Sequence, residues 1–325
     1  MKFVQSENDE RAMLAGYTFS EKRALRCVNF FPTFLRHSKG DFGGKPFELI
    51  DWQRDDVVYP LFGWLRPNGT RRYTRSYIEI PKKNGKSTIA SGIALYLLVG
   101  DGERGAEVYC AATDKKQAKI VWDESAVMVE ASPELLGALS IHRSSSTITF
   151  PATNSFLRAL SGEAAGNEGW NAHALIVDEL HKWQGRKLWD ALKWAFAARR
   201  QPLLFVITTA GDDPLSVCMQ QHNYALGVND GKIPDLNFFG YVRCAEDTDD
   251  WLDEATWKKA NPSLGVTMDI DRFREDVLEA AKTPESQASF KRYRLNVWNA
   301  GENGWIKPAS WKACQRVIEW GGGAA

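Results

Sequence analysis

Short apolar runs alternate with segments of helical spacing through the first two thirds of the chain. The runs that have the length of buried β-strands are 77–80, 106–112, 174–177 and 203–207. The segments whose apolar side chains recur at helical spacing are 89–97, 114–131 and 183–199. Strands that alternate with helices predict an α/β fold, in which helices flank a doubly wound, mainly parallel sheet.

The alternating core is flanked by other kinds of segment. A helix over 52–65 is expected, with Asp51 as its N-cap and a bend at Pro60. After Gly211 the chain reads as mixed loops and helices. We therefore divide it into an N-terminal helical extension, the core, a smaller helical or mixed lid, and the start of a linker. These four parts are 1–45, 46–211, 212–310 and 311–325.

The first core strand runs into a basic loop that ends in Gly85-Lys86-Ser87 at the start of a helix. Such a helix start binds phosphate, because backbone N–H groups and the helix dipole face the anion. Lys86 would reach the β- and γ-phosphates, and the Ser87 hydroxyl would hold Mg²⁺. Ile80 replaces the usual first glycine, so a plain strand-turn-helix is the alternative. The residues predicted to bind nucleotide here are Pro81, Lys82, Lys83, Asn84, Gly85, Lys86, Ser87 and Thr88.

Polar residues also end the two later core strands. Asp178 and Glu179 follow one of them, and Thr208 and Thr209 follow the other. The carboxyl ends of parallel strands meet at one edge of a sheet, where ligands bind. There, Asp178 would hold Mg²⁺, Glu179 would orient and deprotonate the attacking water, and Thr208 would sense the γ-phosphate. Taken alone, each motif has another explanation: the two acids could cap a helix N-terminus, and the threonines could be ordinary strand residues before a turn. Together with the loop they predict an ATP hydrolase with a P-loop NTPase core.

Two further features bear on this site. Trp52 and Gln53 start the helix upstream of the loop, and the Gln53 carboxamide has the donor and the acceptor needed to recognise adenine. A buried tryptophan beside a surface glutamine is the alternative. Phosphoryl transfer usually needs an arginine, supplied in cis or by a neighbouring subunit. Arg200 is our candidate, with Arg199 and Arg158 as others, although cations such as Arg199 and Arg200 are also common at helix ends.

Composition narrows the class of protein. The 325 residues are 44% hydrophobic and 25% charged with a formal net charge of +0, which is ordinary for a globular chain and does not advertise nucleic-acid binding. The five cysteines include no CxxC pair, so we expect neither a zinc site nor a disulfide framework. The apolar run near the loop, 93–99, is too short to span a bilayer, and the charged N-terminus does not resemble a signal peptide.

Several motifs together resemble the large terminase subunit of tailed bacteriophages, of the HK97-like kind. They are Trp52-Gln53, PKKNGKST at 81–88, LIVDELH at 175–181, TTAG at 208–211, RYRLNVW at 292–298 and Trp305. The resemblance implies a P-loop NTPase of the RecA-like (ASCE) kind at 46–211 with a smaller lid subdomain. Family roles in adenine contact, phosphate and metal binding, catalysis and coupling would fall on Gln53, Lys86, Ser87, Asp178, Glu179 and Thr208.

The resemblance also implies what the protein works with. Its members are ATP-driven motors that package double-stranded DNA into a procapsid, with ATP and Mg²⁺ as cofactors. The implied partners are DNA, the portal protein, the small terminase subunit and further copies of the chain in a ring on the portal. We expect a monomer in isolation, in the host cytoplasm, with no membrane partner. The family has a second, nuclease domain, which we expect to be absent here, and with it nuclease activity.

Two other functions remain open from the sequence. Asp178 to His181 also fits the DExH motif of a superfamily 2 helicase, but such an enzyme needs a second RecA-like domain. The residues after Gly211 lack the strand–helix alternation of such a domain. A non-catalytic nucleotide-binding module would explain the missing first glycine, but it has no use for Glu179. His181 itself is expected to be a capping or core residue.

Overall fold

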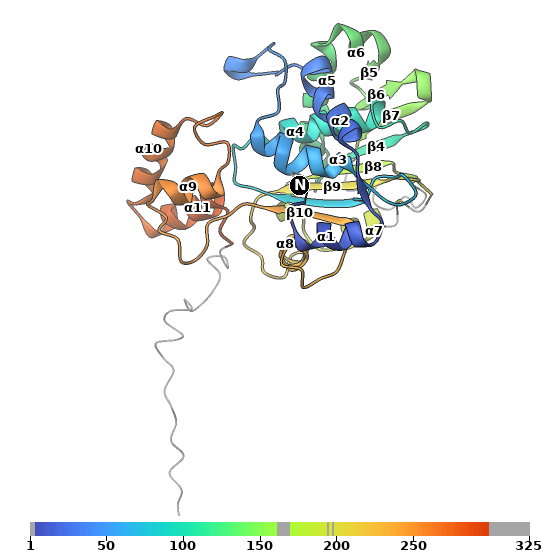
Figure 1. Ribbon diagram of the computed structural model, residues 1–325. Helices are drawn as coiled ribbons and strands as arrows, with labels where there is room; N and C mark the ends of the chain where they lie inside the picture. Colours follow the sequence, from blue (N-terminus) through green and yellow to red (C-terminus); the bar gives the residue numbers. More distant parts are fainter. Residues whose placement is uncertain (1–3, 161–169, 194, 197, 299–325) are drawn as a thin grey trace, which may run out of the picture.

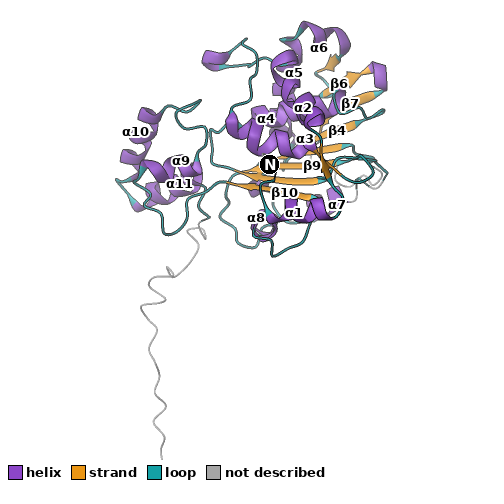
Figure 2. Cartoon of the chain, in the orientation of Figure 1, coloured by secondary structure: helices purple, strands orange, loops and turns teal. Residues whose placement is uncertain are grey.

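The computed structural model describes residues 4–160, 170–193, 195–196 and 198–298. Its centre is an eight-stranded sheet with the order β10-β3-β9-β8-β4-β7-β6-β5 (Figure 2). The strands from β10 to β7 are parallel, and β6 and β5 continue the sheet in antiparallel fashion. The strands are β3 Arg75–Glu79, β4 Glu107–Ala111, β5 Ser140–His142, β6 Thr147–Phe150, β7 Ser155–Ala159, β8 Ala174–Asp178, β9 Leu203–Thr208 and β10 Phe238–Val242. This confirms the predicted α/β class and the four core strands.

Helices cover both faces of the sheet (Figure 1). The helices on one face are α2 Glu21–Phe34, α3 Tyr59–Gly63, α4 Lys86–Val99, α5 Lys115–Glu130 and α6 Pro133–Ala138. Those on the other face are α1 Glu7–Leu14, α7 Lys187–Lys193 and α8 Val217–Asn229. Each face has its own hydrophobic cluster, so the sheet is the middle layer of three. None of the helices in the described ranges is long and apolar enough to cross a bilayer.

Helix α4, which follows the basic loop, is buried on nearly all sides. It lies between the sheet, α5 and α2, so it needs no polar face. Gly92 lets α2 approach, because a Cβ built there would lie 2.3 Å from Cε1 of Phe31. Since α4 is fixed in this way, its first residue, Lys86, has a fixed position at the edge of the sheet.

The N-terminal segment is helical, as predicted, and it is part of the main core. Phe31 of α2 is fully buried, and β1 (Thr18–Phe19) pairs with β2 (Trp64–Leu65). Asp9 of α1 forms a buried ion pair with Arg72, at 2.6 Å between carboxylate and guanidinium. Packing and charge therefore attach the described part of this segment, 4–45, to the body of the protein.

Two predicted helices differ from the structure. The helix expected over 52–65 is a π-helix, η2 (Trp52–Val58), continued by α3; Asp51 is already helical and does not cap it. Pro60 is the second residue of α3, just after the π-helix passes into the α-helix. The helix expected over 183–199 is only α7, preceded by the 3₁₀ turn η5 (Leu180–Lys182). Gly185 interrupts it with a φ of +68°. Two more 3₁₀ turns are η1 Gly40–Phe42 and η3 Pro151–Thr153.

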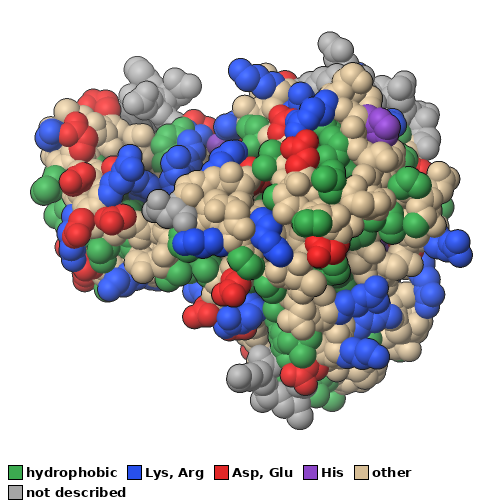
Figure 3. Space-filling model, turned by 90° about the horizontal axis from the view of Figure 1, so that it is seen from above, with side chains coloured by type: hydrophobic (Ala, Val, Ile, Leu, Met, Phe, Trp, Pro, Cys, Tyr) green, Lys and Arg blue, Asp and Glu red, His purple; other side chains and the backbone are tan. Residues whose placement is uncertain are grey.

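The segment expected as a lid, 212–310, is divided in the structure as far as residue 298. Residues 299–310 with Trp305, and the expected linker start at 311–325, lie outside the described residues. Helix α8 and strand β10 belong to the sheet body, because β10 pairs with β3 along the strand that carries the loop. The helices α9 Glu254–Ala260, α10 Ile270–Ala280 and α11 Pro284–Leu295 form a separate lobe. Side chains of Asp253, Asp269 and Thr283 cap their N-termini. Figure 3 shows this smaller lobe joined to the sheet body, with Lys and Arg side chains near the junction.

Candidate nucleotide-binding site

Three polar strand ends meet at one edge of the sheet. Strand β9 lies between β3 and β8, so Thr208 stands between the basic loop after β3 and the acids after β8. This is the arrangement predicted from the order of the motifs. The parallel direction of the three strands is what brings their carboxyl ends together.

The loop after β3 takes a conformation that requires glycine at one point. Gly85 has a φ of +79°, and a Cβ there would lie 3.3 Å from Nε2 of Gln53. Helix α4 begins at the next residue, Lys86, which is buried to 6% exposure. The Lys86 ammonium donates to the carbonyls of Ile80 (3.2 Å) and Pro81 (3.0 Å). Burial lowers the pKa of Lys86, against the nearby acids Glu179 and Asp178, which raise it. A buried cation is thus held at the start of a helix, facing two carboxylates.

Ser87 and Asp178 are in direct contact. The Ser87 hydroxyl donates to Oδ2 of Asp178 at 3.0 Å, while Oδ1 is buried with no hydrogen-bond partner among the described residues. Burial and the charge of Glu179 raise the pKa of Asp178 to about 6. Hydroxyl and carboxylate oxygens are ligands that suit Mg²⁺, which in such sites takes one or two protein carboxylates together with substrate phosphates. The partnerless oxygen beside the serine therefore fits a divalent cation.

Glu179 has an unusual backbone and a distinct charge environment. Its φ and ψ are +54° and +48°, in the left-handed region, directly after β8. Burial would raise the pKa of Glu179, but the contact with His181 and the charges of Lys86 and Lys182 outweigh it and lower the pKa to about 2. The side chain is 20% exposed and thus reaches solvent. The two adjacent acids therefore differ, with Glu179 the more readily ionised.

The Thr208 hydroxyl, at the end of β9, makes hydrogen bonds within the protein. Its hydroxyl accepts a hydrogen bond from the backbone N–H of His181 at 3.1 Å and donates to the Thr209 carbonyl at 3.1 Å. The residue is fully buried. The structure thus connects the tip of β9 with the segment that follows the acids, through a histidine expected only to cap or fill the core.

The side chains of two residues predicted to bind nucleotide make contacts with β10 and with the segment after α9. The Trp52 ring stacks on Tyr241, and its indole N–H donates to Ser263 at 3.0 Å. The Asn84 carboxamide is buried, donates to Asn261 at 3.0 Å and accepts from the Ser263 N–H at 3.2 Å. The Trp52 and Asn84 side chains thus join the loop region to β10 and to the segment after α9. Their part in nucleotide binding stays a prediction.

The rest of the loop stays compatible with the prediction. Gln53 lies against Gly85, and its Oε1 accepts from the Ile50 N–H at 3.3 Å. The Lys82 ammonium lies 3.4 Å from the centroid of the Tyr293 ring in α11, and burial lowers its pKa. Lys83 is exposed and has a φ of +72°.

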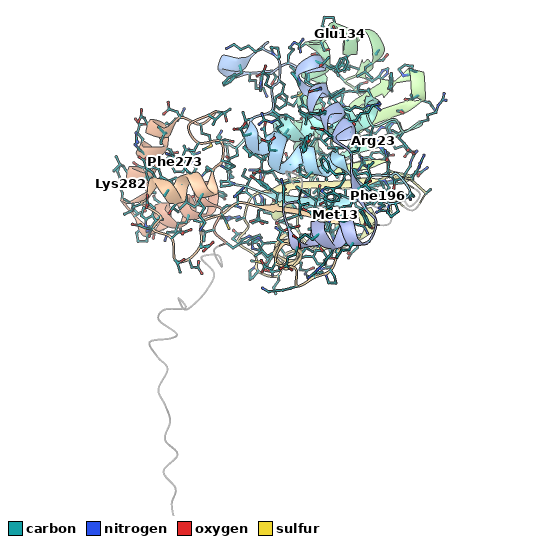
Figure 4. All side chains as sticks on the ribbon, in the orientation of Figure 1. Met13, Arg23, Glu134, Phe196, Phe273 and Lys282 are labelled. Carbon is teal, nitrogen blue, oxygen red and sulfur yellow. The ribbon has the colours of Figure 1, made fainter. Side chains whose placement is uncertain are left out.

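The arginine candidates lie away from the phosphate loop. Arg199 and Arg200 precede β9, so its six residues, at about 3.3 Å each, put about 20 Å between them and Thr208. Arg199 is occupied by Glu103 and Glu107, at 3.5 and 3.4 Å. Arg200 lines a cavity of about 580 Å³ together with Arg23, which Figure 4 shows far from the helical lobe. Arg200 therefore cannot act in the site of its own chain, and a role in a neighbour's site stays a prediction.

One buried group at this edge was not predicted. Glu79, the last residue of β3, is fully buried, and its carboxylate accepts from Tyr77 (2.5 Å), Asn296 (3.0 Å) and Trp298 (3.1 Å). Nδ1 of His222 lies 2.9 Å from it. A glutamate inside an otherwise apolar strand was the signal in the sequence that could have identified it.

Comparison with known proteins gives two adjoining family matches. The model of the terminase large subunit ATPase domain matches residues 51–227, and that of the terminase large subunit endonuclease domain matches 232–318. The large terminase subunit of Enterobacteria phage HK97 is 26% identical over 296 residues, which are 90% of this chain and 56% of that protein. Protein YmfN of Escherichia coli (strain K12) is 30% identical over 152 residues, 46% of this chain and 32% of that protein. The chain thus spans about half or less of the length of these relatives.

Solved structures agree. The crystal structure of the HK97 large terminase has a TM-score of 0.74 and 25% identity, over 85% of this chain and 55% of that one. The ATPase domain of the Thermus phage P74-26 large terminase has a TM-score of 0.50 and 16% identity, over 70% of this chain and 91% of that one, and shares the fold. These similarities do not favour a superfamily 2 helicase.

The endonuclease match conflicts with the expectation that the nuclease region lies entirely beyond this chain. The matched range, 232–318, includes β10 and the helical lobe, which the sequence assigned to a lid. Sequence analysis did not identify a nuclease region in this range, because no acidic residues lie on predicted strands there. Within the described residues there is also no group of three His, Cys, Asp or Glu placed to hold a metal ion.

The ATPase match covers more than half of the chain and contains the phosphate loop, the paired acids and the β9 tip at adjacent strand ends. The chain therefore belongs to the terminase large subunit family and carries its ATPase domain.

Proposed function

We propose that this chain hydrolyses Mg²⁺-bound ATP at the edge where β3, β9 and β8 end, and that hydrolysis drives double-stranded DNA into a procapsid. One observation carries the proposal. Ser87 and Asp178 meet at 3.0 Å beside a carboxylate oxygen that has no partner among the described residues, between a buried lysine and a second acid. A site that only bound phosphate would have no need for two buried carboxylates, which repel anions.

Each residue has a distinct task in this mechanism. Lys86 and the N-terminus of α4 offer positive charge to the phosphates. Ser87 and Asp178 would hold Mg²⁺, which when bound neutralises charge on the phosphoryl oxygens. Glu179 is ionised at neutral pH and would orient the attacking water and take its proton. Gln53, beside Gly85, would contact the base.

The first experiment measures ATP binding and turnover separately. Lys86→Ala is expected to weaken ATP binding, because it removes the charge that faces the phosphates. Glu179→Gln should bind ATP normally but turn it over at least ~100-fold more slowly, the scale of losing a general base. Lys39→Ala is the matched control, since the Lys39 side chain is 82% exposed. Near-normal phosphate release by Glu179→Gln would remove Glu179 from the mechanism.

The motor function needs partners. We propose that the chain works as a homo-oligomeric ring on the portal protein in the host cell, with the small terminase subunit, and that it is a monomer and a weak ATPase alone. Arg200 of one subunit would then complete the site of the next. Specific ATPase activity should rise with protein concentration or on adding portal and DNA, and Arg200→Ala should inhibit wild-type protein when the two are mixed. Flat specific activity and an arithmetic average in the mixture would contradict the role of Arg200.

A further inference from the structure

His181 lies between the two elements that the mechanism needs to coordinate. Its Nδ1 is 3.0 Å from Oε2 of Glu179 and 3.2 Å from Oγ1 of Thr208. Its backbone N–H also donates to the Thr208 hydroxyl. The side chain is only 3% exposed, so it has little freedom to turn to solvent. One imidazole nitrogen therefore faces both the acid after β8 and the tip of β9.

The groups around Nδ1 favour a proton on that nitrogen. The Thr208 hydroxyl donates to the Thr209 carbonyl, so it presents lone pairs to His181. The ionised Glu179 carboxylate can only accept. With acceptors on both sides of Nδ1, we assign the proton to Nδ1. Oε2 of Glu179 is buried and has no hydrogen-bond partner in the described part of the chain apart from this close contact.

The backbone around Glu179 brings the histidine into place. The Glu179 N–H donates to Ile207 of β9 at 3.0 Å, and its carbonyl accepts from the Lys182 N–H at 2.9 Å. Between these bonds Glu179 takes its left-handed conformation, which costs a non-glycine residue about 1–3 kcal/mol. The turn directs the chain back, so that His181 contacts the side chain of the residue two positions earlier.

We propose that His181 is a positioning residue, which holds the Glu179 carboxylate where it can take a proton from the attacking water and makes the orientation of that carboxylate depend on Thr208. This deepens the proposed function and rests on it. Because a single Nδ1–H lies close to both acceptors, a displacement of the β9 tip changes how closely His181 approaches Glu179. The strand between the phosphate loop and the acids can thereby control the catalytic base without touching it.

The test compares three substitutions of the histidine in steady-state ATP turnover. His181→Ala should lower kcat about 10- to 100-fold, the usual loss for a residue that orients a catalytic group, with KM and ATP affinity little changed. His181→Asn should recover most of kcat, because its amide N–H stands near the position of Nδ1. His142→Ala is the matched control, since His142 is exposed and lies 3.4 Å from the Thr149 hydroxyl. That control should keep wild-type kcat.

Double mutants with Thr208→Val and with Glu179→Gln distinguish the positioning role of His181 from the proposed function on which that role rests. Thr208→Val and His181→Ala should be non-additive in kcat, as for groups in one network, and His181→Ala should have no further effect in Glu179→Gln. If Glu179→Gln is slow and His181→Ala is as fast as wild type, the positioning role is wrong and the proposed function stands. If Glu179→Gln is not slow, the function assigned to Glu179 fails. A His181→Ala protein with a lower melting temperature but normal kcat would show that the histidine serves only packing.

Discussion

The ion pair between Arg71 and Asp101 should contribute strongly to stability and little to catalysis. Both Asp101 oxygens accept from Nη1 of Arg71, at 3.0 and 2.9 Å, and the side chains are 3% and 5% exposed. His173 and Gln201 also contact the carboxylate, at 3.0 and 3.1 Å. These four residues lie before β3, β4, β8 and β9, at the edge opposite the phosphate loop.

Asp101→Asn keeps the shape but leaves the Arg71 charge buried without a counter-ion. Breaking a buried pair in this way costs about 3–5 kcal/mol. At about 2 °C per kcal/mol for a chain of this size, the melting temperature should fall by about 6–10 °C. The matched control is Glu130→Gln, which breaks the pair with Arg143, whose side chain is 54% exposed. That surface pair should contribute about 0–1 kcal/mol.

The pH dependence gives a second measurement. Burial would raise the pKa of Asp101, but the charge of Arg71 and the hydrogen bond to His173 outweigh it, so the folded-state pKa lies below its usual value. A lowered folded-state pKa stabilises the protein above the unfolded value of about 3.9. The gap in melting temperature between wild type and Asp101→Asn, followed by scanning calorimetry, should therefore be full at pH 7 and narrow as pH falls below about 4. An Asp101→Asn protein as stable as Glu130→Gln at pH 7, or a gap unchanged at low pH, would refute the reasoning.

Three further predictions concern other parts of the molecule. Gly92→Ala should cost about 1–3 kcal/mol in urea unfolding, because its Cβ would meet an aromatic carbon of α2 at 2.3 Å, whereas Gly137→Ala, with open space around it, should cost nothing. Asn84→Ala should speed amide hydrogen exchange in α9, since Asn261 loses its partner in the loop; unchanged exchange would count against that contact. Finally, the described residues hold no group of three His, Cys, Asp or Glu placed to bind a metal ion, so we expect no Mn²⁺-dependent linearisation of supercoiled plasmid from them; linear product that persists in Asp178→Ala would contradict this and assign the activity to the endonuclease match at 232–318.

The sequence predicts those parts of the site that depend on local order. The position of Gly85-Lys86-Ser87 at a helix start follows from the nearby sequence alone, because the residues just after it form the helix α4. Asp178 and Thr208 were placed correctly for a similar reason: parallel strands bring their ends to one edge.

The sequence does not show which polar residues find distant partners. Asn84 looks like a phosphate-loop residue, yet it bonds to Asn261, 177 positions later. The contacts of His181 and Trp52 cannot be seen in the sequence for the same reason, since their partners, Thr208 and Ser263, belong to other elements. A polar side chain is buried when a distant segment supplies its hydrogen-bond partner. The pattern of residues along the chain does not show which distant residues will meet.

The buried Glu79 carboxylate has a consequence for the order in which the protein folds. Two of its donors, Asn296 and Trp298, are 217 and 219 positions further along the chain. During synthesis the N-terminal part emerges first, at about 5–20 residues per second. For at least about ten seconds by that rate, the Glu79 carboxylate has Tyr77 as a donor but lacks Asn296 and Trp298, and burying an incompletely paired carboxylate is costly. We therefore expect β3, the strand that carries the phosphate loop, to reach its final packing only after the ribosome has synthesised α11 and the residues just after it. The nucleotide site should then be among the last parts of the molecule to fold.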